Sequence, residues 1–426
     1  MENIEQLREE NNRLRKAIEE LSILNDIARF IGSSLSVDAV IENVVKGSVR
    51  AVHGQQGLIT LVDEAAPTEM KTLIRAQTSA IQQQKFHLNQ NILGWMLINK
   101  KPLLSNELST DVRFSGVKID PDVQSVLCVP LLVKSRLTGL LTVFNKKEGG
   151  GFSEDDKRLL SIIGTQSAQV LENARLYEQE RSLLTFQEQM KVAAQIQSDL
   201  LPQKSPQIPG YEIAGMSIPA QSIGGDYYDF IPIDESRIAL CLGDVTGKGL
   251  PAALLMANVQ ATLRGQTLVG ASAKECLTRS NQLLINSKSE EKFVTLFYGV
   301  LDYQQHKLNY CNAGHDFPYL ISTSGEVKRL KEGGIMLGVI EGYPFKEMTV
   351  PINVGDLMVV YSDGITEAMD PNLNFYEESR LFEVLKQQPG VPVKEVVEHI
   401  VSAVKTHAGS HPQSDDITVV ALRRVG

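Results

Sequence analysis

The stretch of chain between Gly164 and Pro202 contains neither proline nor glycine. Within it, two rows of mostly apolar residues recur every seven positions: Leu176, Leu183 and Met190 in one, and Phe186, Ala193 and Leu200 in the other. Heptads of this kind are typical of a coiled coil. The SEDD segment at 153–156 resembles a capping box that would begin the helix. We therefore predict one helix about 70 Å long, which is longer than a single domain needs.

Length and composition are those of a globular protein with two or three domains. The chain has 426 residues, more than one domain of roughly 150 residues. Acidic residues outnumber basic ones by 51 to 42, and the net charge of -9 argues against binding to nucleic acid or an anionic membrane. The longest uncharged apolar run, 125–133, is too short for a membrane span. Four scattered cysteines without a C-x-x-C pair indicate reduced thiols, so we expect a cytoplasmic location.

The first 21 residues predict a second coiled coil. Leu7, Leu14 and Leu21 recur every seven residues, while Asn11 and Asn25 occupy the other seam position. A polar Asn at a seam position is a known device for fixing the register of paired helices. We expect a homodimer through this helix. The alternative is a solvated helix that packs on its own domain.

Residues 22–174 predict a sensor domain. The apolar runs GLITLV at 57–62 and LTGLLTVF at 137–144 are typical of strands. The domain resembles a GAF domain in three segments: SVLCVPLL (125–132), TGLLTVFNK (138–146) and FSEDDKRLLSIIGTQSAQVLENA (152–174). The resemblance implies an antiparallel sheet with helices.

Some GAF domains that bind cyclic nucleotides carry an Asn-Lys, Phe, Asp-Glu signature. Asn145, Lys146, Phe152 and Asp156 match it, but Lys157 stands where the Glu belongs. The signature is mostly structural, so the ligand or signal of this GAF domain stays unassigned.

Aspartates stand beside apolar runs in the C-terminal half of the chain. The four candidates for metal ligands are Asp226, Asp244, Asp363 and Asp415. Strand ends of a rigid sheet can hold several side chains around one point. Two carboxylates about 4 Å apart repel by about 4 kcal/mol at an effective dielectric near 20. Hard cations such as Mg²⁺ or Mn²⁺ relieve this repulsion through oxygen ligands, so the pattern predicts a two-metal site acting on phosphate.

Five motifs are similar, in order, to the metal-dependent protein phosphatases of the SpoIIE and RsbU type (PPM family). They are GGDYYDF (224–230), GDVTGKG (243–249), NAGH (312–315), YSDGITEA (361–368) and SDDITVVAL (414–422). The second motif is not a phosphate-binding P-loop, because three residues rather than four separate its first Gly from Gly-Lys.

This resemblance implies an αββα sandwich with two ions, Mn²⁺ or Mg²⁺, that hydrolyses phosphoserine or phosphothreonine. It implies that Asp244 bridges both ions and that the backbone carbonyl of Val245 joins one of them. Asp363 and Asp415 would complete the second ion's ligands, and Asp226 would support the first. A metal-bound water is the nucleophile in this family, so no phosphoenzyme is expected.

Other polar residues near the motifs are candidates for supporting roles. We expect Asp416 to support the ligands, and His315 either to act as general acid for the leaving group or to satisfy a loop backbone. His407 and His411 are expected to belong to a polar loop rather than to bind metal. Gln221 stands where an arginine that clamps phosphate would be convenient. Substrate binding would then depend on the metals and on the partner's surface.

The chain is interpreted as an α+β multidomain protein. The predicted parts are a coiled-coil helix (1–21), a GAF sensor domain (22–174), a helical coiled-coil linker (175–203) and an αββα-sandwich phosphatase (204–426).

The predicted function is that of a GAF-regulated serine/threonine protein phosphatase of bacterial signalling. By resemblance, its substrate is a phosphorylated STAS-domain anti-anti-sigma factor or a similar partner-switching regulator. Gln179 and Gln197 interrupt the linker's apolar seam, so a signal at the GAF domain is expected to change how paired helices pack and whether the metal site assembles. The alternatives are a non-catalytic scaffold that binds a phosphoprotein and a two-metal nucleotide phosphodiesterase.

Overall fold

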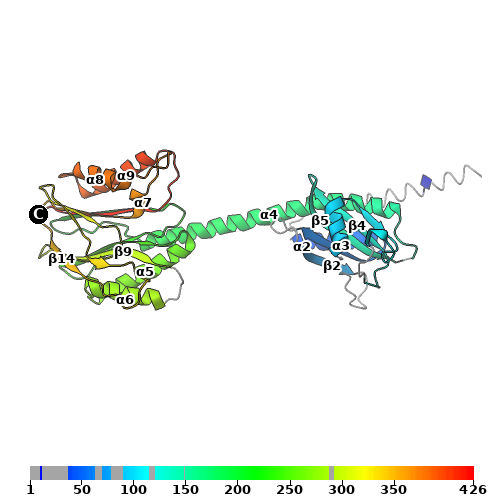
Figure 1. Ribbon diagram of the computed structural model, residues 1–426, viewed down its shortest axis with the longest axis horizontal. Coiled ribbons are helices and arrows are strands. Elements are labelled where there is room, and N and C mark those ends of the chain that lie inside the picture. Colours follow the sequence, from blue (N-terminus) through cyan, green and yellow to red (C-terminus); the bar gives the residue numbers. More distant parts are fainter. Residues whose placement is uncertain are drawn as a thin grey trace, which may run out of the picture. The chain divides into compact units, whose positions relative to one another are not determined.

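The computed structural model describes residues 10–11, 37–62, 70–77, 90–114, 120–147, 149–286 and 292–426. The chain divides into two compact units, Met1–Thr185 and Phe186–Gly426 (Figure 1). The coiled coil predicted for 1–21 lies outside the described residues, apart from 10–11, which are helical. Within the described ranges, no helix combines the length and the apolar character that a bilayer crossing requires.

The first unit is a five-stranded antiparallel sheet with helices on both faces. Its strands lie in the order β2-β1-β5-β4-β3. Along β5, Leu141 and Val143 pack with α2 and the first turns of α4, whereas Leu140 and Phe144 pack with α3. This alternation follows from the two-residue period of a strand. The elements are α2 (Val37–Ala51), β1 (Gly54–Val62), β2 (Met70–Gln77), α3 (Gln90–Asn99), β3 (Leu103–Ser105), η1 (Val112–Phe114), β4 (Val126–Val133) and β5 (Arg136–Lys146).

The Asn-Lys signature of this unit makes structural contacts. The Asn145 side-chain oxygen accepts hydrogen bonds from the backbone N–H groups of Gln124 (2.9 Å) and Ser125 (3.1 Å). The ammonium of Lys146 pairs with Asp156 in the first turn of α4. These contacts join the end of β5 to the start of β4 and to α4, which accounts for the signature as part of the fold.

Helix α4 (Glu154–Leu200) has 47 residues, which confirms the predicted long helix. Its first turn is the predicted capping box. The Ser153 hydroxyl accepts a hydrogen bond from the N–H of Asp156 (3.1 Å), and the Asp156 carboxylate accepts one from the N–H of Ser153 (2.8 Å). The heptad residues Leu176, Leu183 and Phe186 are 53%, 57% and 55% exposed. Exposed apolar residues at this spacing are typical of a helix surface that pairs with another helix.

The second unit consists of two sheets packed face to face, with helices on both outer sides (Figure 1). One sheet has the order β13-β10-β9-β8-β7, with β14 paired to β10, and the other has the order β12-β11-β15-β16-β6. The strands of the first sheet are β7 (Tyr227–Pro232), β8 (Arg237–Val245), β9 (Val294–Asp302), β10 (Lys307–Ala313), β13 (Gly333–Gly334) and β14 (Met348–Pro351). Those of the second are β6 (Tyr211–Ile218), β11 (Tyr319–Ile321), β12 (Val327–Arg329), β15 (Leu357–Tyr361) and β16 (Ile417–Arg424).

Three apolar layers hold this unit together. Helices α5 (Leu250–Leu268) and α6 (Ala273–Asn286) cover the first sheet, while α8 (Glu377–Lys386) and α9 (Val393–Ala408) cover the second. The short helix α7 (Asp363–Thr366) follows β15. Along β8, Ala239 and Cys241 face α5 and α6, whereas Leu240 and Leu242 face the other sheet. The unit is therefore the αββα sandwich that the motifs predict.

Candidate metal centre

Strand pairing places the four predicted ligands at strand ends, two of them in each sheet. Strand β7 begins just after Asp226 and pairs antiparallel with β8, which ends on Asp244 and Val245. Strand β15 ends shortly before Asp363 and pairs antiparallel with β16, which begins shortly after Asp415. Antiparallel pairing sets the start of one strand beside the end of its neighbour. Each sheet therefore contributes two carboxylates at one edge.

The carboxylates of the two sheets lie close enough to repel one another. Burial, and next the charge of Asp415, raise the pKa of Asp244 to about 6. Burial, and next the charge of Asp244, raise the pKa of Asp363 to about 7. Burial and Asp244 also raise the pKa of Asp226 well above its usual range. Ionising these acids together is costly, and a divalent cation is the counter-charge that relieves this cost.

The donor set suits a hard divalent cation. It consists of four carboxylates and one backbone carbonyl, and oxygen donors are the ones that Mg²⁺ and Mn²⁺ prefer. The Oδ2 atom of Asp226 is buried without a hydrogen-bond partner. Gly225 approaches the Val245 carbonyl so closely that a Cβ at this position would lie 2.8 Å from its oxygen. These features fit the ligand set that the motifs imply.

The side chains are not drawn together into a closed ligand set. No group of three His, Cys, Asp or Glu residues in the described part of the chain is gathered tightly enough to hold a cation as it stands. Instead, the Lys248 ammonium lies 3.0 Å from Oδ2 of Asp415. The positive charge next to these carboxylates is therefore that of the Lys248 side chain.

Asp416 holds the loop that carries Asp226. Its Oδ1 accepts a hydrogen bond from the backbone N–H of Ala220 (2.8 Å), and its Oδ2 accepts bonds from the N–H groups of Gly225 (2.6 Å) and Asp226 (3.2 Å). A Cβ at Gly224 would come within 2.3 Å of the same Oδ2 atom, so glycine is needed there. Both oxygens of Asp416 are thus engaged by the backbone, and its supporting role at a metal centre stays a prediction.

His315 is buried and its ring contacts Thr295. Its side chain is 4% exposed, and Nδ1 lies 2.9 Å from the hydroxyl of Thr295, the residue that pairs with Asp244 across β8 and β9. Burial lowers the pKa of His315 to about 4. Its backbone N–H donates to the side chain of Asn312 (2.8 Å), and the Asn312 amide donates back to the His315 carbonyl (3.0 Å). A buried neutral imidazole favours the loop-supporting role over the general-acid role.

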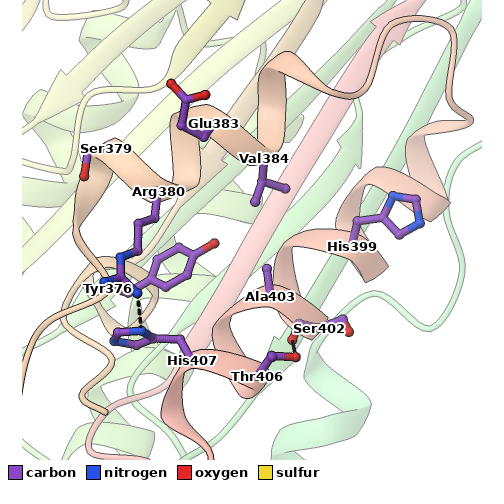
Figure 2. Close-up of a pocket in the computed structure, with 10 residues that line it drawn as sticks. All are labelled: Tyr376, Ser379, Arg380, Glu383, Val384, His399, Ser402, Ala403, Thr406 and His407. Atoms are coloured by element: carbon purple, nitrogen blue, oxygen red, sulfur yellow. Dashed lines mark hydrogen bonds between the residues drawn. The ribbon is translucent and has the colours of Figure 1, made fainter. Parts of the chain in front are cut away.

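The other two histidines of the candidate list make local contacts. His407 Nδ1 lies 2.6 Å from Arg380, and its Nε2 lies 3.0 Å from the carbonyl of Asn374. His411 Nδ1 lies 2.9 Å from the carbonyl of Pro412. Figure 2 shows His407 beside Arg380 in a groove of about 660 Å³ between α8 and α9. None of the four candidate carboxylates lines this groove.

Two residues of the site were not predicted as such. Lys248 belongs to a motif that superficially resembles a P-loop, and its contact with Asp415 joins residues far apart in sequence. Gln197 was predicted only as an interruption of the heptads. Its side-chain amide donates to the carbonyl of Gly224 (2.7 Å) and accepts from the N–H of the same residue (3.0 Å). No sequence signal indicates either partner.

Comparisons with known proteins agree with this fold. Residues 34–172 match the GAF domain family, and residues 234–425 match the family of stage II sporulation protein E (SpoIIE). The chain is 29% identical over 253 residues to the phosphoserine phosphatase RsbU of Bacillus subtilis (strain 168), an alignment covering 58% of this chain and 75% of RsbU. It is 26% identical over 201 residues to the phosphoserine phosphatase RsbP of the same organism, covering 46% of this chain and 48% of RsbP.

Among solved structures, the SiaA-PP2C domain of Pseudomonas aeruginosa has the same fold. It aligns with a TM-score of 0.52 at 22% identity and covers 57% of this chain and 98% of that domain. The chain therefore contains one segment that matches the GAF domain family and a second segment that matches the SpoIIE family and has the fold of a PP2C domain. It is homologous to the phosphoserine phosphatases RsbU and RsbP.

The raised acid pKa values predict that manganese binds more tightly as the pH rises. Near pH 6 much of Asp363 and part of Asp244 carry protons that Mn²⁺ would have to displace, whereas at pH 8 both are ionised. We expect the Mn²⁺ affinity of the full chain to rise about tenfold between pH 6 and pH 8. Isothermal titration calorimetry in buffers of different ionisation enthalpy measures both the affinity and the protons released. An affinity independent of pH would contradict the coupling.

The same acids set the sign of the pH effect on stability. Their pKa values in the folded chain exceed the value near 4 of an unfolded chain, so their contribution to the free energy of unfolding falls as the pH rises from about 4 to 7. Buried His315 works in the opposite direction over part of this range. The increase in Tm on adding Mn²⁺ separates the two effects, because His315 contributes equally to the stability of the metal-free and the Mn²⁺-bound chain. That gain should increase with pH.

Proposed function

We propose that this chain is a GAF-regulated, metal-dependent phosphatase that hydrolyses phosphoserine or phosphothreonine on a partner-switching protein of the STAS-domain type. The observation that carries the proposal is the set of mutually repelling carboxylates at the facing sheet edges, with the buried and unpartnered Oδ2 of Asp226 among them. The names of RsbU and RsbP as phosphoserine phosphatases support the reaction class.

In this proposal each ligand has its own place in the centre. Asp244 would bridge two cations, with Asp226 and the Val245 carbonyl supporting one and with Asp363 and Asp415 completing the other. When bound, two divalent cations supply an activated water and stabilise the charge that develops on the phosphoryl oxygens. The protein's contribution is to hold these oxygens on rigid strand ends. Asp416 fixes the loop before Asp226, and His315 supports Thr295 beside Asp244.

Helix α4 is placed to control this centre within the second unit. Gln197 makes two hydrogen bonds to the backbone of Gly224, two residues before Asp226. The exposed heptad residues Leu183 and Phe186 lie on the same helix. We propose that a second copy of the chain pairs with α4 along these residues. A signal at the GAF domain would then change this pairing and move Gln197 with its loop.

The role of Gln197 can be tested against a matched residue of the same helix. Gln197→Ala removes both bonds to Gly224, so we expect kcat/KM to fall about 10- to 100-fold, as for other supports of metal ligands. Gln195→Ala is the control, because the side-chain hydrogen bond that the described residues give Gln195 is to the exposed Asp199 one turn on. It should leave activity within about twofold of wild type. Equal losses in the two variants would show that helix stability, and not the clamp on Gly224, is what matters.

Phosphate release from a phosphoserine protein tests the reaction itself. The full chain is assayed with Mn²⁺, and again after the metal is removed by chelation. We expect turnover with the metal and none without it. Metal binding without turnover on any phosphoprotein would favour the non-catalytic scaffold. Turnover of cyclic or linear dinucleotides but not of phosphoproteins would favour the phosphodiesterase.

A further inference from the structure

Lys248 lies in the loop between β8 and α5 and contacts Asp415, one of the four candidate ligands. Gly247 and Gly249 on either side of it have φ values of 97° and 72°, a conformation that favours glycine. The Lys248 ammonium lies 3.0 Å from Oδ2 of Asp415 and donates a 2.5 Å hydrogen bond to the carbonyl of Ser414. Two left-handed glycines thus present one long cationic side chain to the site.

Lys248 supplies a positive side-chain charge next to the candidate metal ligands. The charges of Asp415, Asp416 and Asp363 all act on it, and its own charge acts on Asp244. Within the described residues, no other ion pair involves any of the candidate metal ligands. A cluster of at least four acids that is to receive a phosphate dianion would otherwise offer it no positive side chain.

The exposure of the Lys248–Asp415 ion pair allows the ammonium to leave Asp415 for another acceptor. The side chains of Lys248 and Asp415 are 49% and 37% exposed. Pairs at such exposure contribute little to stability, so holding the fold together does not account for this contact. The four-carbon stem of a lysine lets its three donors move to a new acceptor without a change in the backbone.

The position at which an arginine would be convenient for clamping phosphate holds a neutral side chain. Gln221 lies against the same loop, since a Cβ at Gly249 would be 3.5 Å from its Oε1 atom. An amide offers two donors but no charge. Lys248, next to Gly249, supplies the charge that Gln221 lacks.

We propose that Lys248 is a phosphate-binding residue that is held in reserve by Asp415. While Asp415 lacks a metal ion, the ammonium is its counter-ion. When a divalent cation takes Asp415, the ammonium is released and donates its hydrogen bonds to the phosphoryl oxygens of the substrate. The inference rests on the proposed function, and it adds that metal binding and phosphate binding are coupled through this side chain.

The test uses the full chain and three variants. Lys248→Met keeps the stem and removes the charge, while Lys248→Arg keeps the charge. Lys386→Met is the matched control, because Lys386 is 50% exposed and forms a 2.7 Å ion pair with Glu383 on α8, away from the site. Two binding constants are measured by calorimetry: that of Mn²⁺ for the metal-free chain, and that of inorganic phosphate for the chain saturated with Mn²⁺.

We expect Lys248→Met to bind Mn²⁺ severalfold more tightly, because the competing ammonium is gone, and to bind inorganic phosphate about tenfold more weakly. Lys248→Arg should restore most of the phosphate affinity, and Lys386→Met should change neither constant. A merely structural lysine would give the opposite metal result, since its loss would disorder Asp415 and weaken Mn²⁺ binding. Unchanged phosphate affinity in Lys248→Met would also overturn the inference.

The two binding constants separate this inference from the proposed function. Neither requires turnover, so a wild-type chain that hydrolyses no phosphoprotein can still show the coupling. Conversely, a wild-type chain that hydrolyses phosphoserine while Lys248→Met binds phosphate normally would refute the role of Lys248 alone.

Discussion

Replacing Asp363 by asparagine is expected to lower manganese-dependent phosphate release at least about 10³-fold and, at the same time, to stabilise the metal-free protein. The loss of activity follows from the loss of a carboxylate ligand, because metal-centred charge stabilisation contributes several kcal/mol and each 1.4 kcal/mol is about a factor of ten. The gain in stability follows from burial of the charged carboxylate and, next, from repulsion by Asp244, which together raise the pKa of Asp363 to about 7. Asparagine has nearly the same shape but carries no charge.

The size of the stabilisation is bounded by the pKa shift. A shift from 3.8 to about 7 corresponds to about 4 kcal/mol for an isolated group. Because Asp363 is coupled to Asp244 and the new amide needs partners of its own, we expect about 1–2 kcal/mol at pH 8. The measurement is denaturant unfolding of the metal-free full chain, with phosphate release assayed in parallel.

Asp370→Asn is the control for Asp363→Asn. The Asp370 carboxylate accepts hydrogen bonds from the side-chain amide of Asn374 (3.0 Å) and from the backbone N–H groups of Asn374 (2.9 Å) and Asn372 (2.8 Å), which keep its pKa below the usual range. Its replacement should weaken the fold slightly and leave activity unchanged. If Asp363→Asn also destabilised the metal-free chain, the repulsion among the carboxylates would not be what shapes this site.

The architecture could be predicted from the sequence because periodicity and strand-edge acids are local signals. The missing prolines and the heptads indicated α4, and the capping box marked its first turn at Ser153. The acids beside apolar runs indicated which strand ends meet. Such patterns report what a segment does to its own backbone and which face it buries.

The contacts that complete the site were beyond that kind of signal. Lys248 meets Asp415 from another sheet, and Gln197 meets Gly224 from the linker helix. Both contacts depend on how separate elements pack. The helix propensity of a lysine or a glutamine is a local property and does not depend on its partner in the fold. His315 is a third example. The NAGH motif is compatible with proton transfer, but it does not show that the side chain is buried and that burial lowers the pKa of its imidazole to about 4.

Replacing Asp416 by alanine should have the opposite effect on stability from Asp363→Asn, although the two acids lie in the same cluster. Asp416 accepts three backbone hydrogen bonds, from Ala220, Gly225 and Asp226. Alanine leaves these N–H groups without their acceptor, and hydrogen bonds to a charged group contribute about 1.5–3 kcal/mol each before non-additivity. We expect the free energy of unfolding to fall by about 2–4 kcal/mol and activity to fall about 10- to 100-fold.

The relief of repulsion works against this loss, because the charge of Asp416 also raises the pKa of Asp226 and of Asp244. With Mn²⁺ bound this relief disappears, so the destabilisation by Asp416→Ala should be larger with Mn²⁺ than after chelation. Asp234→Ala is the control, an exposed turn acid that accepts from the N–H of Ser236 (2.9 Å) and should change neither activity nor the response to Mn²⁺. An Asp416→Ala variant that is more stable than wild type without metal would identify Asp416 as a ligand-like acid. If Asp363→Asn raises and Asp416→Ala lowers the free energy of unfolding of the metal-free chain, Asp363 acts as a metal ligand and Asp416 stabilises the loop next to the ligands.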